Sequence, residues 1–157
     1  VAIQSANDAS APDGIHSYAK NGFVGELTND GIDLMLDVFQ RSPSLYDMFM
    51  DPCGGAYARV PLEATAFPRR DMAFILAIWS GWPNGDGADE KVARMRADWK
   101  QLEPLTQGFY TNYAGTDPVA ARDRENFGAN FERLVAVKTK YDPTNLFRLN
   151  ANVAPKA

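Results

Sequence analysis

The most constraining feature of this sequence is its most apolar segment, residues 71–82, which reads DMAFILAIWSGW. The large residues of this segment are Phe, Ile and Trp, and they lack the spacing of an amphipathic helix. This pattern favours a central strand that is buried on both faces. A buried helix is the second interpretation. The most strongly apolar part, residues 74–79, is far too short to span a bilayer.

Three other stretches carry apolar residues at helical spacing and predict amphipathic helices. The first follows the candidate caps Thr28, Asn29 and Asp30, the second begins at Asp89, and the third runs from about residue 126 to residue 140. Their predicted buried residues are Ile32, Met35, Leu36 and Phe39 in the first, Val92, Met95, Trp99 and Leu102 in the second, and Phe127, Phe131 and Leu134 in the third.

Shorter segments between the helices predict the remaining strands. In residues 55–60, alternation puts Tyr57 and Arg59 on one face and small side chains on the other. The element order favours an α+β fold, an antiparallel β-sheet with helices covering one face. The other face is open and needs a partner, either another domain or a second copy. The predicted strands are 16–26, 45–51, 55–60 and 109–113, in addition to 71–82.

The two ends of the chain differ in character from its middle. Residues 1–15 are small and polar without periodicity, so we interpret them as a linker and the chain as a fragment of a longer polypeptide. Residues 16–140 form the predicted α+β domain. Residues 141–157 form a tail, which we expect to dock back on the domain because Leu146, Phe147 and Leu149 need a surface to cover.

Composition excludes several classes of function. The 157 residues include 16 basic and 20 acidic side chains without a basic cluster, so neither nucleic acid nor an anionic membrane is a predicted partner. One cysteine, Cys53, and one histidine, His16, are too few for an internal disulfide or a His/Cys metal cluster, and no metal site is predicted. We interpret both residues as structural. Cellular location is left open, because the start of the parent protein is not in this chain.

The segment FYTNY, residues 109–113, is the strongest candidate for chemistry from pattern alone. Alternation places Tyr110 and Asn112 on one face of the predicted strand and Tyr113 on the other, so hydroxyl or amide groups would meet a cleft. Aromatic residues are also common in strands without any function. Asp51, which precedes a Pro-Cys-Gly-Gly turn, would by the same standard cap that turn.

Four stretches in one order resemble the berberine bridge enzyme-like FAD-linked oxidases. They are GGAYARVPLEATAFPRRD at 54–71, FYTNYAGTD at 109–117, NFERLVAVKTKYDPTNLFR at 130–148 and the terminal YDPTNLFRLNANV. The segment SYAKNGFV at 17–24 also resembles a strand of that family. The resemblance covers nearly everything from about residue 16 onward, and it suggests the substrate domain with its C-terminal tail.

The resemblance implies a division of labour within a longer polypeptide. An N-terminal region, absent here, would hold FAD, and this chain would roof the active site with the open face of its sheet. Neither His16 nor Cys53 lies in the family's flavin-attachment motifs, so covalent attachment is not carried onto them. The implied reaction is oxidation of an alcohol on a sugar or secondary metabolite, with hydride transfer to flavin and reoxidation by O₂. The chain alone is expected to be inactive.

The resemblance also implies roles for particular residues. The second Tyr of the family's Y-x-N-Y motif, its common catalytic base, falls on Tyr113, and Asp51 falls where some members carry an assisting carboxylate. A phenol with a pKa of about 10 needs a positive charge or donors to act as a base near neutral pH. The other implied residues are Tyr110, Asn112 and Asn150 near the cofactor, and Tyr57 and Arg59 near the substrate.

One departure from the family pattern changes a charge near the predicted site. Many members read F-P-H-R where this chain has FPRR at 67–70, so any role of the missing His does not transfer. Residues 58–60 also lack the acidic residue of some plant members, so their ring-closing chemistry is not implied. A different class of function remains as the alternative: a stand-alone binding module that dimerises through its open sheet face.

Overall fold

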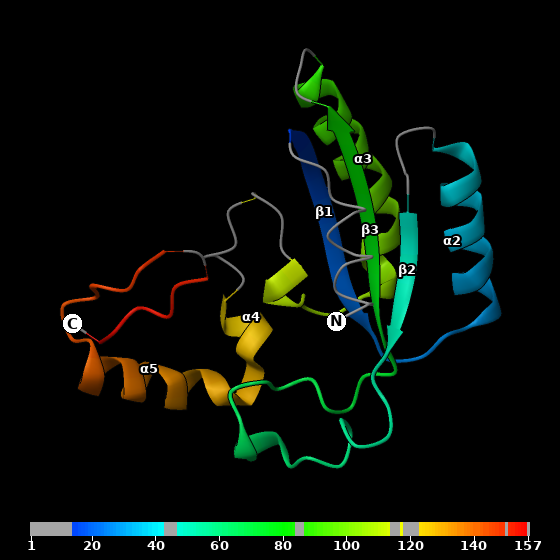
Figure 1. Ribbon diagram of the computed structural model, residues 1–157. Helices are drawn as coiled ribbons and strands as arrows, with labels where there is room; N and C mark the ends of the chain where they lie inside the picture. Colours follow the sequence, from blue (N-terminus) through cyan, green and yellow to red (C-terminus); the bar gives the residue numbers. More distant parts are fainter. Residues whose placement is uncertain are drawn as a thin grey trace, which may run out of the picture.

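We describe the protein from a computed structural model (Figure 1), and the description covers residues 14–42, 47–83, 87–113, 117, 123–149 and 151–156. Its centre is a three-stranded antiparallel sheet in the order β1 (Ile15–Val24), β3 (Phe74–Pro83), β2 (Asp47–Pro52). The central strand β3 coincides with most of the apolar segment 71–82 and ends one residue beyond it, which confirms a central strand and excludes the buried helix. Among the described residues no helix is long and apolar enough to cross a bilayer.

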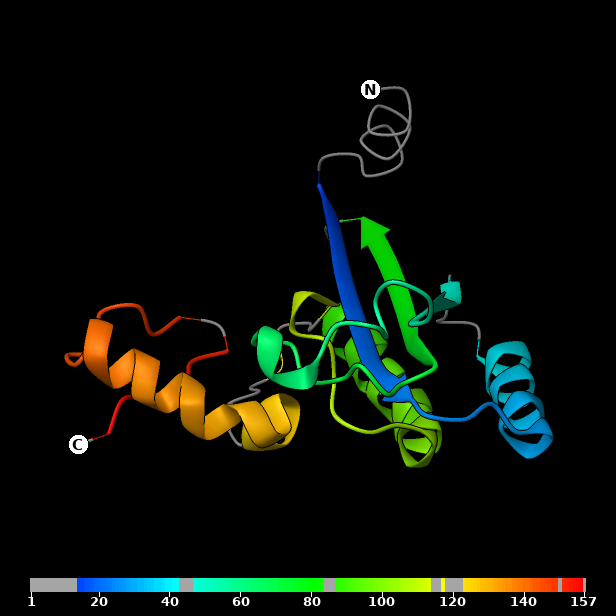
Figure 2. The same cartoon turned by 90° about the horizontal axis from the view of Figure 1, so that it is seen from below.

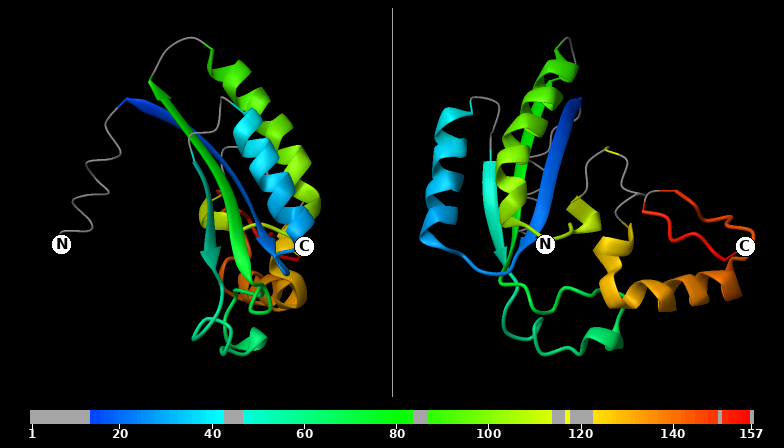
Figure 3. Two further views of the ribbon diagram at one scale, coloured as in Figure 1. Left: turned by 90° about the vertical axis from the view of Figure 1, so that its right-hand side faces the viewer. Right: turned by 180° about the vertical axis from the view of Figure 1, so that it is seen from behind.

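Helices α2 (Asn29–Arg41) and α3 (Ala88–Leu102) lie side by side over one face of the sheet (Figure 3). The Thr28 hydroxyl caps α2 by accepting a hydrogen bond from the Gly31 amide at 3.1 Å. The predicted α+β architecture is therefore confirmed. The core between helices and sheet is formed by Tyr18, Val24, Met35, Val38, Leu76, Ile78, Trp82, Met95, Trp99 and Leu102.

The apolar face predicted for α2 is only partly correct. Met35 and Val38 are buried as the helix packs on the sheet, but Leu36 and Phe39 are 51% and 43% exposed. The stripe that packs is rotated toward Met35 and Val38, which lie in the core between the helices and the sheet. The spacing in α3 was predicted correctly, since Met95, Trp99 and Leu102 are all buried.

The face of the sheet that turns away from α2 and α3 is called the open face. Register and alternation assign to it Ile15, Ser17, Ala19, Asn21 and Phe23 of β1, Ile75, Ala77, Trp79 and Gly81 of β3, and Asp47, Phe49 and Asp51 of β2. One end of this face is covered by a second core, made by Phe23, Cys53, Met72 and Ile75 with Tyr57, Phe67 and Tyr110 packed against them. Its other end is exposed, with Trp79 39% and Ile15 38% accessible.

Two predicted strands are absent. Residues 55–60 form turns, and Gly55 adopts a left-handed conformation with φ of 63°, which does not fit an extended strand. Residues 109–113 follow Gly108, which has φ of 59°, and they end in the 3₁₀ helix η3 (Thr111–Tyr113). The alternating pattern was a poor guide in both segments because they cross the end of the sheet instead of extending it.

The C-terminal region lies beside the sheet (Figures 1 and 2). The predicted helix over 126–140 is divided into α4 (Asp123–Phe127), a 3₁₀ turn and α5 (Phe131–Tyr141), since Gly128 has φ of 48°. The tail returns along α5, where the Lys156 amide donates to the Thr139 hydroxyl at 2.8 Å.

We expected the tail to bury its apolar side chains against the domain. Within this chain they stay exposed. Leu146, Phe147 and Leu149 are 68%, 78% and 85% exposed. Its conformation is held by polar contacts around Asp142, which accepts from the Leu146 and Phe147 amides and pairs with Lys138. Docking of the tail near a flavin site is a separate prediction, which the described residues do not test.

Candidate functional site

The segment that contains Tyr113 is attached to the sheet by Asn21, which points from β1 toward the open face. The Asn21 amide oxygen accepts from the Tyr110 backbone N–H at 2.6 Å, and its nitrogen donates to the Tyr110 carbonyl at 3.1 Å. Asn21 is 5% exposed, so these bonds are shielded from water. The backbone of Phe23 also exchanges hydrogen bonds with Gln107. Residues 107–110 are thereby fixed over β1.

Tyr113 and Asp51, the two residues to which the resemblance gave catalytic roles, meet over the open face. The Tyr113 hydroxyl donates to Asp51 Oδ2 at 3.1 Å, and its ring lies edge-on to Phe49 with centroids 6.0 Å apart. Tyr113 is 37% exposed. In this arrangement a ligand can reach the Tyr113 hydroxyl, and that hydroxyl is bonded to a carboxylate that can accept a proton.

Tyr110 and Asn112 support this pair from one side. The Tyr110 ring packs edge-on against Tyr113 with centroids 5.1 Å apart and against Phe67 at 6.0 Å. The Asn112 side chain is exposed and donates to the Tyr110 hydroxyl at 2.8 Å. The rings of Phe67, Tyr110 and Tyr113 therefore form a continuous wall that orients the phenol of Tyr113.

The surroundings of Tyr113 keep its phenol protonated. Partial burial raises its pKa above the usual value, and the hydrogen bond to Asp51, the Asp51 charge and Tyr110 all act in the same direction. The sequence analysis required a positive charge or donors that stabilise a phenolate, but all four of these influences oppose the phenolate. Any proton that reaches Tyr113 must therefore be passed on, and Asp51 is in position to take it.

Tyr57 and Arg59, the predicted substrate pair, are not brought together. The Tyr57 ring is packed in the second core and its hydroxyl donates to the Arg69 carbonyl at 2.5 Å, whereas Arg59 is exposed on a turn. Their shared face disappears with the predicted strand. Burial raises the pKa of Tyr57, and this phenol remains protonated.

The two arginines of the FPRR stretch hold loops together. Arg69 donates to the Glu125 carbonyl at 2.8 Å and so ties this stretch to α4. Arg70 donates to the Tyr57 carbonyl at 3.3 Å and lies over the rings of Tyr57 and Phe67, 5.1 and 5.0 Å from their centroids. Arg69, which stands where many family members carry His, thus ties two segments together, and Arg70 packs on the second core.

The other residues singled out from the sequence are Asn150, Cys53 and His16. Asn150 lies outside the residues that the structure describes. Cys53 is buried, and burial raises the pKa of its thiol, which agrees with the structural interpretation. His16 is exposed on β1. Over the described ranges, His, Cys, Asp and Glu form no group of three that could hold a metal ion.

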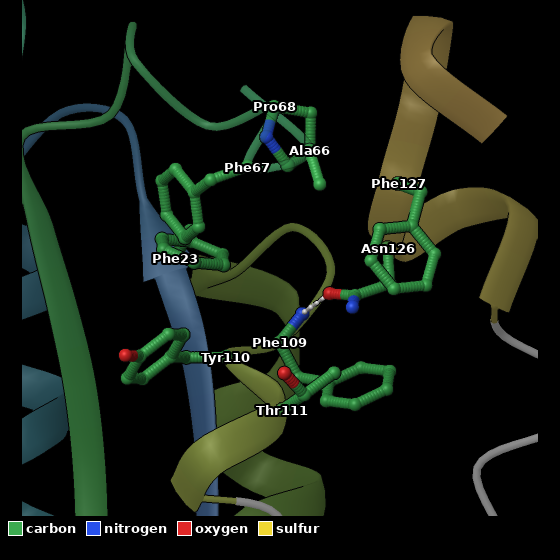
Figure 4. Close-up of a pocket in the computed structure, with 9 residues that line it drawn as sticks. All are labelled: Phe23, Ala66, Phe67, Pro68, Phe109, Tyr110, Thr111, Asn126 and Phe127. Atoms are coloured by element: carbon green, nitrogen blue, oxygen red, sulfur yellow. Dashed lines mark hydrogen bonds between the residues drawn. The ribbon is translucent and has the colours of Figure 1, made fainter. Parts of the chain in front are cut away.

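A pocket of about 180 Å³ opens between the second core and α4 (Figure 4). The dashed line in the figure is the hydrogen bond from the Phe109 amide to Asn126 Oδ1, at 3.4 Å. Tyr110 belongs to its wall, but the pocket is otherwise lined by groups that do not titrate, which gives it no evident acid–base chemistry. The lining residues are Phe23, Ala66, Phe67, Pro68, Phe109, Tyr110, Thr111, Asn126 and Phe127.

A charged cluster anchors the chain shortly after Tyr113. Asp117 pairs with Lys20 of β1 and with Arg96 of α3, and it accepts a hydrogen bond from the Tyr18 hydroxyl at 2.5 Å. Burial alone would raise the Asp117 pKa, but hydrogen bonds from Arg96, Lys20 and Tyr18 outweigh it and hold that pKa well below its usual range. Burial and the bond to Asp117 raise the pKa of Tyr18 to about 12.

Sequence reasoning missed two residues that shape this region, Asn21 and Trp79. Asn is unfavourable in strand interiors, so Asn21 in the middle of a predicted strand was an available signal. Trp79 was expected to be buried with its neighbours, but it lies on the exposed end of the open face. A Trp followed two residues later by a Gly gave no clear indication of this.

Comparisons with known proteins agree with the geometry. The family profile described as "Berberine and berberine like" matches residues 109–154, which include Tyr113 and the tail. The chain is 34% identical over 102 residues to an uncharacterised FAD-linked oxidoreductase, YvdP, of Bacillus subtilis, covering 65% of this chain and 23% of that protein. It is 30% identical over 125 residues to berberine bridge enzyme-like 17 of Arabidopsis thaliana, covering 69% and 24% respectively.

The chain therefore spans about a quarter of the length of these two relatives. A solved structure of chitooligosaccharide oxidase superposes with a TM-score of 0.78 at 22% identity, covering 90% of this chain and 33% of that one. At this identity the likeness shows a shared fold. The profile match, the named relatives and the shared fold all indicate one family, and the chain belongs to the berberine bridge enzyme-like FAD-linked oxidoreductases.

Proposed function

We propose that this chain forms the substrate-side wall of an FAD-dependent oxidoreductase that oxidises an alcohol of a sugar or a secondary metabolite. The observation that carries the proposal is the Tyr113–Asp51 pair, whose hydrogen bond of 3.1 Å lies on the open sheet face. A solved protein of the same fold is named chitooligosaccharide oxidase, which supports an alcohol substrate. The FAD-binding region of the same polypeptide would be the partner that covers this face.

The pair suggests a two-step path for one proton. The substrate hydroxyl donates its proton to the Tyr113 oxygen, and the phenol proton passes to Asp51 Oδ2. This relay avoids a free phenolate, which the raised pKa of Tyr113 disfavours. Phe49 and Tyr110 pack edge-on against the Tyr113 ring and hold it in line with Asp51. These contacts support the proposed role of Tyr113 and Asp51 in proton transfer.

The exposed groups of the open face fit FAD as one wall of its site. The exposed Trp79 and Tyr113 and the half-buried Phe49 present aromatic rings, which suit a planar isoalloxazine and an organic substrate, and Asn112 offers an exposed amide. The sequence has no glycine-rich phosphate loop, so the diphosphate would be held by the N-terminal region. When bound, FAD supplies the acceptor for the hydride that leaves the substrate carbon.

The proposal is tested by Tyr113→Phe in the full-length flavoprotein. Phenylalanine keeps the ring contacts with Phe49 and Tyr110 but removes the hydroxyl that bonds Asp51. We expect anaerobic flavin reduction by an alcohol substrate to slow by about 10²- to 10⁴-fold, the usual contribution of a positioned acid–base group. The flavin content should not change. A reduction rate equal to that of the parent protein would rule out Tyr113 as the proton acceptor.

Asp51→Asn separates the relay from direct action of a phenolate. Asparagine keeps a hydrogen-bond acceptor near the Tyr113 hydroxyl but does not take its proton. The variant then depends on the small fraction of phenolate, so its rate of flavin reduction should increase steadily between about pH 7 and 10. A pH profile parallel to that of the parent protein would show that Asp51 is not the final proton acceptor.

A further inference from the structure

The pocket beside α4 is a second space that the proposed proton path does not use, since neither Tyr113 nor Asp51 lines it. Its volume is about 180 Å³. Engineered apolar cavities of about 150 Å³ bind benzene, whereas pockets for drug-sized ligands have about 300–1,000 Å³. The pocket is therefore of a size for a molecule with a single ring.

Aromatic rings form most of the pocket wall, and they come from four separate segments of the chain (Figure 4). Phe23 and Phe109 are 1% and 5% exposed, so this part of the wall belongs to the packed interior. None of the lining residues is charged. A charged ligand would lose its hydration there without gaining a partner, so the pocket suits a neutral and mainly apolar molecule. The rings belong to Phe23, Phe67, Phe109, Tyr110 and Phe127.

One polar group in the pocket wall lacks a partner for its donor. Asn126 is 5% exposed, and its side chain points from α4 into the pocket, toward Phe109 (Figure 4). The Phe109 N–H donates to Asn126 Oδ1 at 3.4 Å, which fixes the orientation of the amide. Asn126 Nδ2 donates to no acceptor among the described residues. Because buried amide groups are normally hydrogen-bonded, this donor indicates an acceptor that the pocket is built to receive.

We propose that this pocket binds a small neutral molecule that consists of one ring and one oxygen acceptor, as in an aryl ketone. The ring packs among the aromatic side chains of the wall, and the oxygen accepts a hydrogen bond from Asn126 Nδ2. The inference does not depend on the proposed function, because this molecule is a ligand and not the alcohol that is oxidised.

The ligand would also restrain the segment that contains Tyr113. Tyr110 lines the pocket, and its ring packs edge-on against Tyr113 with centroids 5.1 Å apart. A molecule that fills the pocket therefore adds contacts to the ring that supports Tyr113. Residues 109–111 should open less often when the pocket is filled, since local opening would break these contacts.

The test compares two ligands of the same shape in the full-length flavoprotein by fluorine NMR. 4-Fluoroacetophenone has a carbonyl acceptor, and 1-ethyl-4-fluorobenzene has a methylene group in its place. Both should bind, and the ketone should bind about 2- to 10-fold more tightly, the usual contribution of one hydrogen bond. Hydrogen exchange with the ketone bound should slow in peptides that contain residues 109–111, and peptides that contain residues 47–51 of β2 should exchange as before.

Two variants separate the donor from the space. Asn126→Asp keeps an oxygen for the Phe109 N–H but has no N–H to donate, so it should abolish the preference for the ketone. Ala66→Leu adds a side chain at an exposed part of the wall and should weaken the binding of both ligands at least tenfold. Ala64→Leu is the matched control, because Ala64 is exposed and does not line the pocket. It should bind both ligands as the parent protein does.

Three results would overturn the inference. If the parent protein binds neither ligand, another part of the polypeptide fills the pocket. If it binds both with equal affinity, Asn126 Nδ2 does not recognise an acceptor. If Ala66→Leu binds them as well as the parent protein does, they bind at another place. None of these results bears on the proposed role of Tyr113, so the two proposals are tested separately.

Discussion

Asn21 should control both the order and the reactivity of the Tyr113 segment, although it lies on a different element. Asn21→Ala removes two hydrogen bonds, of 2.6 and 3.1 Å. It leaves the Tyr110 N–H without this acceptor, whereas the Tyr110 C=O keeps only the bond from the Tyr113 amide at 3.0 Å. Losing each bond in this shielded place costs about 1–1.5 kcal/mol. The local opening of residues 107–113 should therefore become easier by about 2–3 kcal/mol.

Hydrogen exchange followed by mass spectrometry measures this change directly. Peptides that contain Tyr110 should exchange about 30- to 150-fold faster in Asn21→Ala, because each 1.4 kcal/mol is a factor of ten. His16→Ala is the matched control, since His16 is an exposed polar residue on the same strand. It should leave the exchange of this segment unchanged.

Asn21 takes no part in the proposed proton path, so its effect on the rate of flavin reduction comes only from positioning Tyr113. A displacement of Tyr113 by about 1 Å should slow flavin reduction by about 10²-fold in the full-length protein. In a Tyr113→Phe background the same Asn21→Ala change should have almost no further effect. An equal loss in both backgrounds, or unchanged exchange at Tyr110, would refute the positioning role.

Two further predictions concern packing and the tail. Gly22→Ala should lower the free energy of unfolding by about 1–3 kcal/mol, because its Cβ would lie 2.6 Å from Thr106 Cβ. Thermal unfolding measures this loss. If Thr106→Gly restores no stability in the double variant, the steric cause is wrong. Lys138 and two backbone N–H groups lower the pKa of Asp142, so its stabilisation of the tail is present above the unfolded pKa of about 3.9 and is lost as the pH falls through the folded pKa. NMR titration should find that pKa below 3.9, and Asp142→Asn should speed proteolysis of the tail at pH 7, with equal rates arguing against the contact.

The candidate site shows how residue pattern and resemblance differ in what they predict. The pattern placed Tyr57 and Arg59 on one face of a strand that the structure replaces with turns. Resemblance named Tyr113 through a motif and Asp51 through its position, without any knowledge that one hydrogen bond would join them. Their roles in catalysis stay a prediction, while their contact is a structural fact.

The tail illustrates a limit of reasoning from hydrophobicity. Its apolar side chains correctly indicated a need for a covering surface, and the structure leaves Leu146, Phe147 and Leu149 exposed on this chain. We infer that the FAD-binding region of the same polypeptide covers them. Hydrophobic content shows that burial is required, but it does not say which surface provides it.

The sequence by itself determined the buried strand β3, the capped helix α2 and the packed stripe of α3, because each depends on the spacing of apolar residues within one segment. It did not determine the course of residues 107–113, where the side-chain amide of Asn21 bonds the backbone N–H and C=O of Tyr110, 89 positions away. It also did not show that Trp79 would be exposed while Ile78 and Ser80 are buried. These features depend on which face of the sheet the helices cover, and only the tertiary structure decides that.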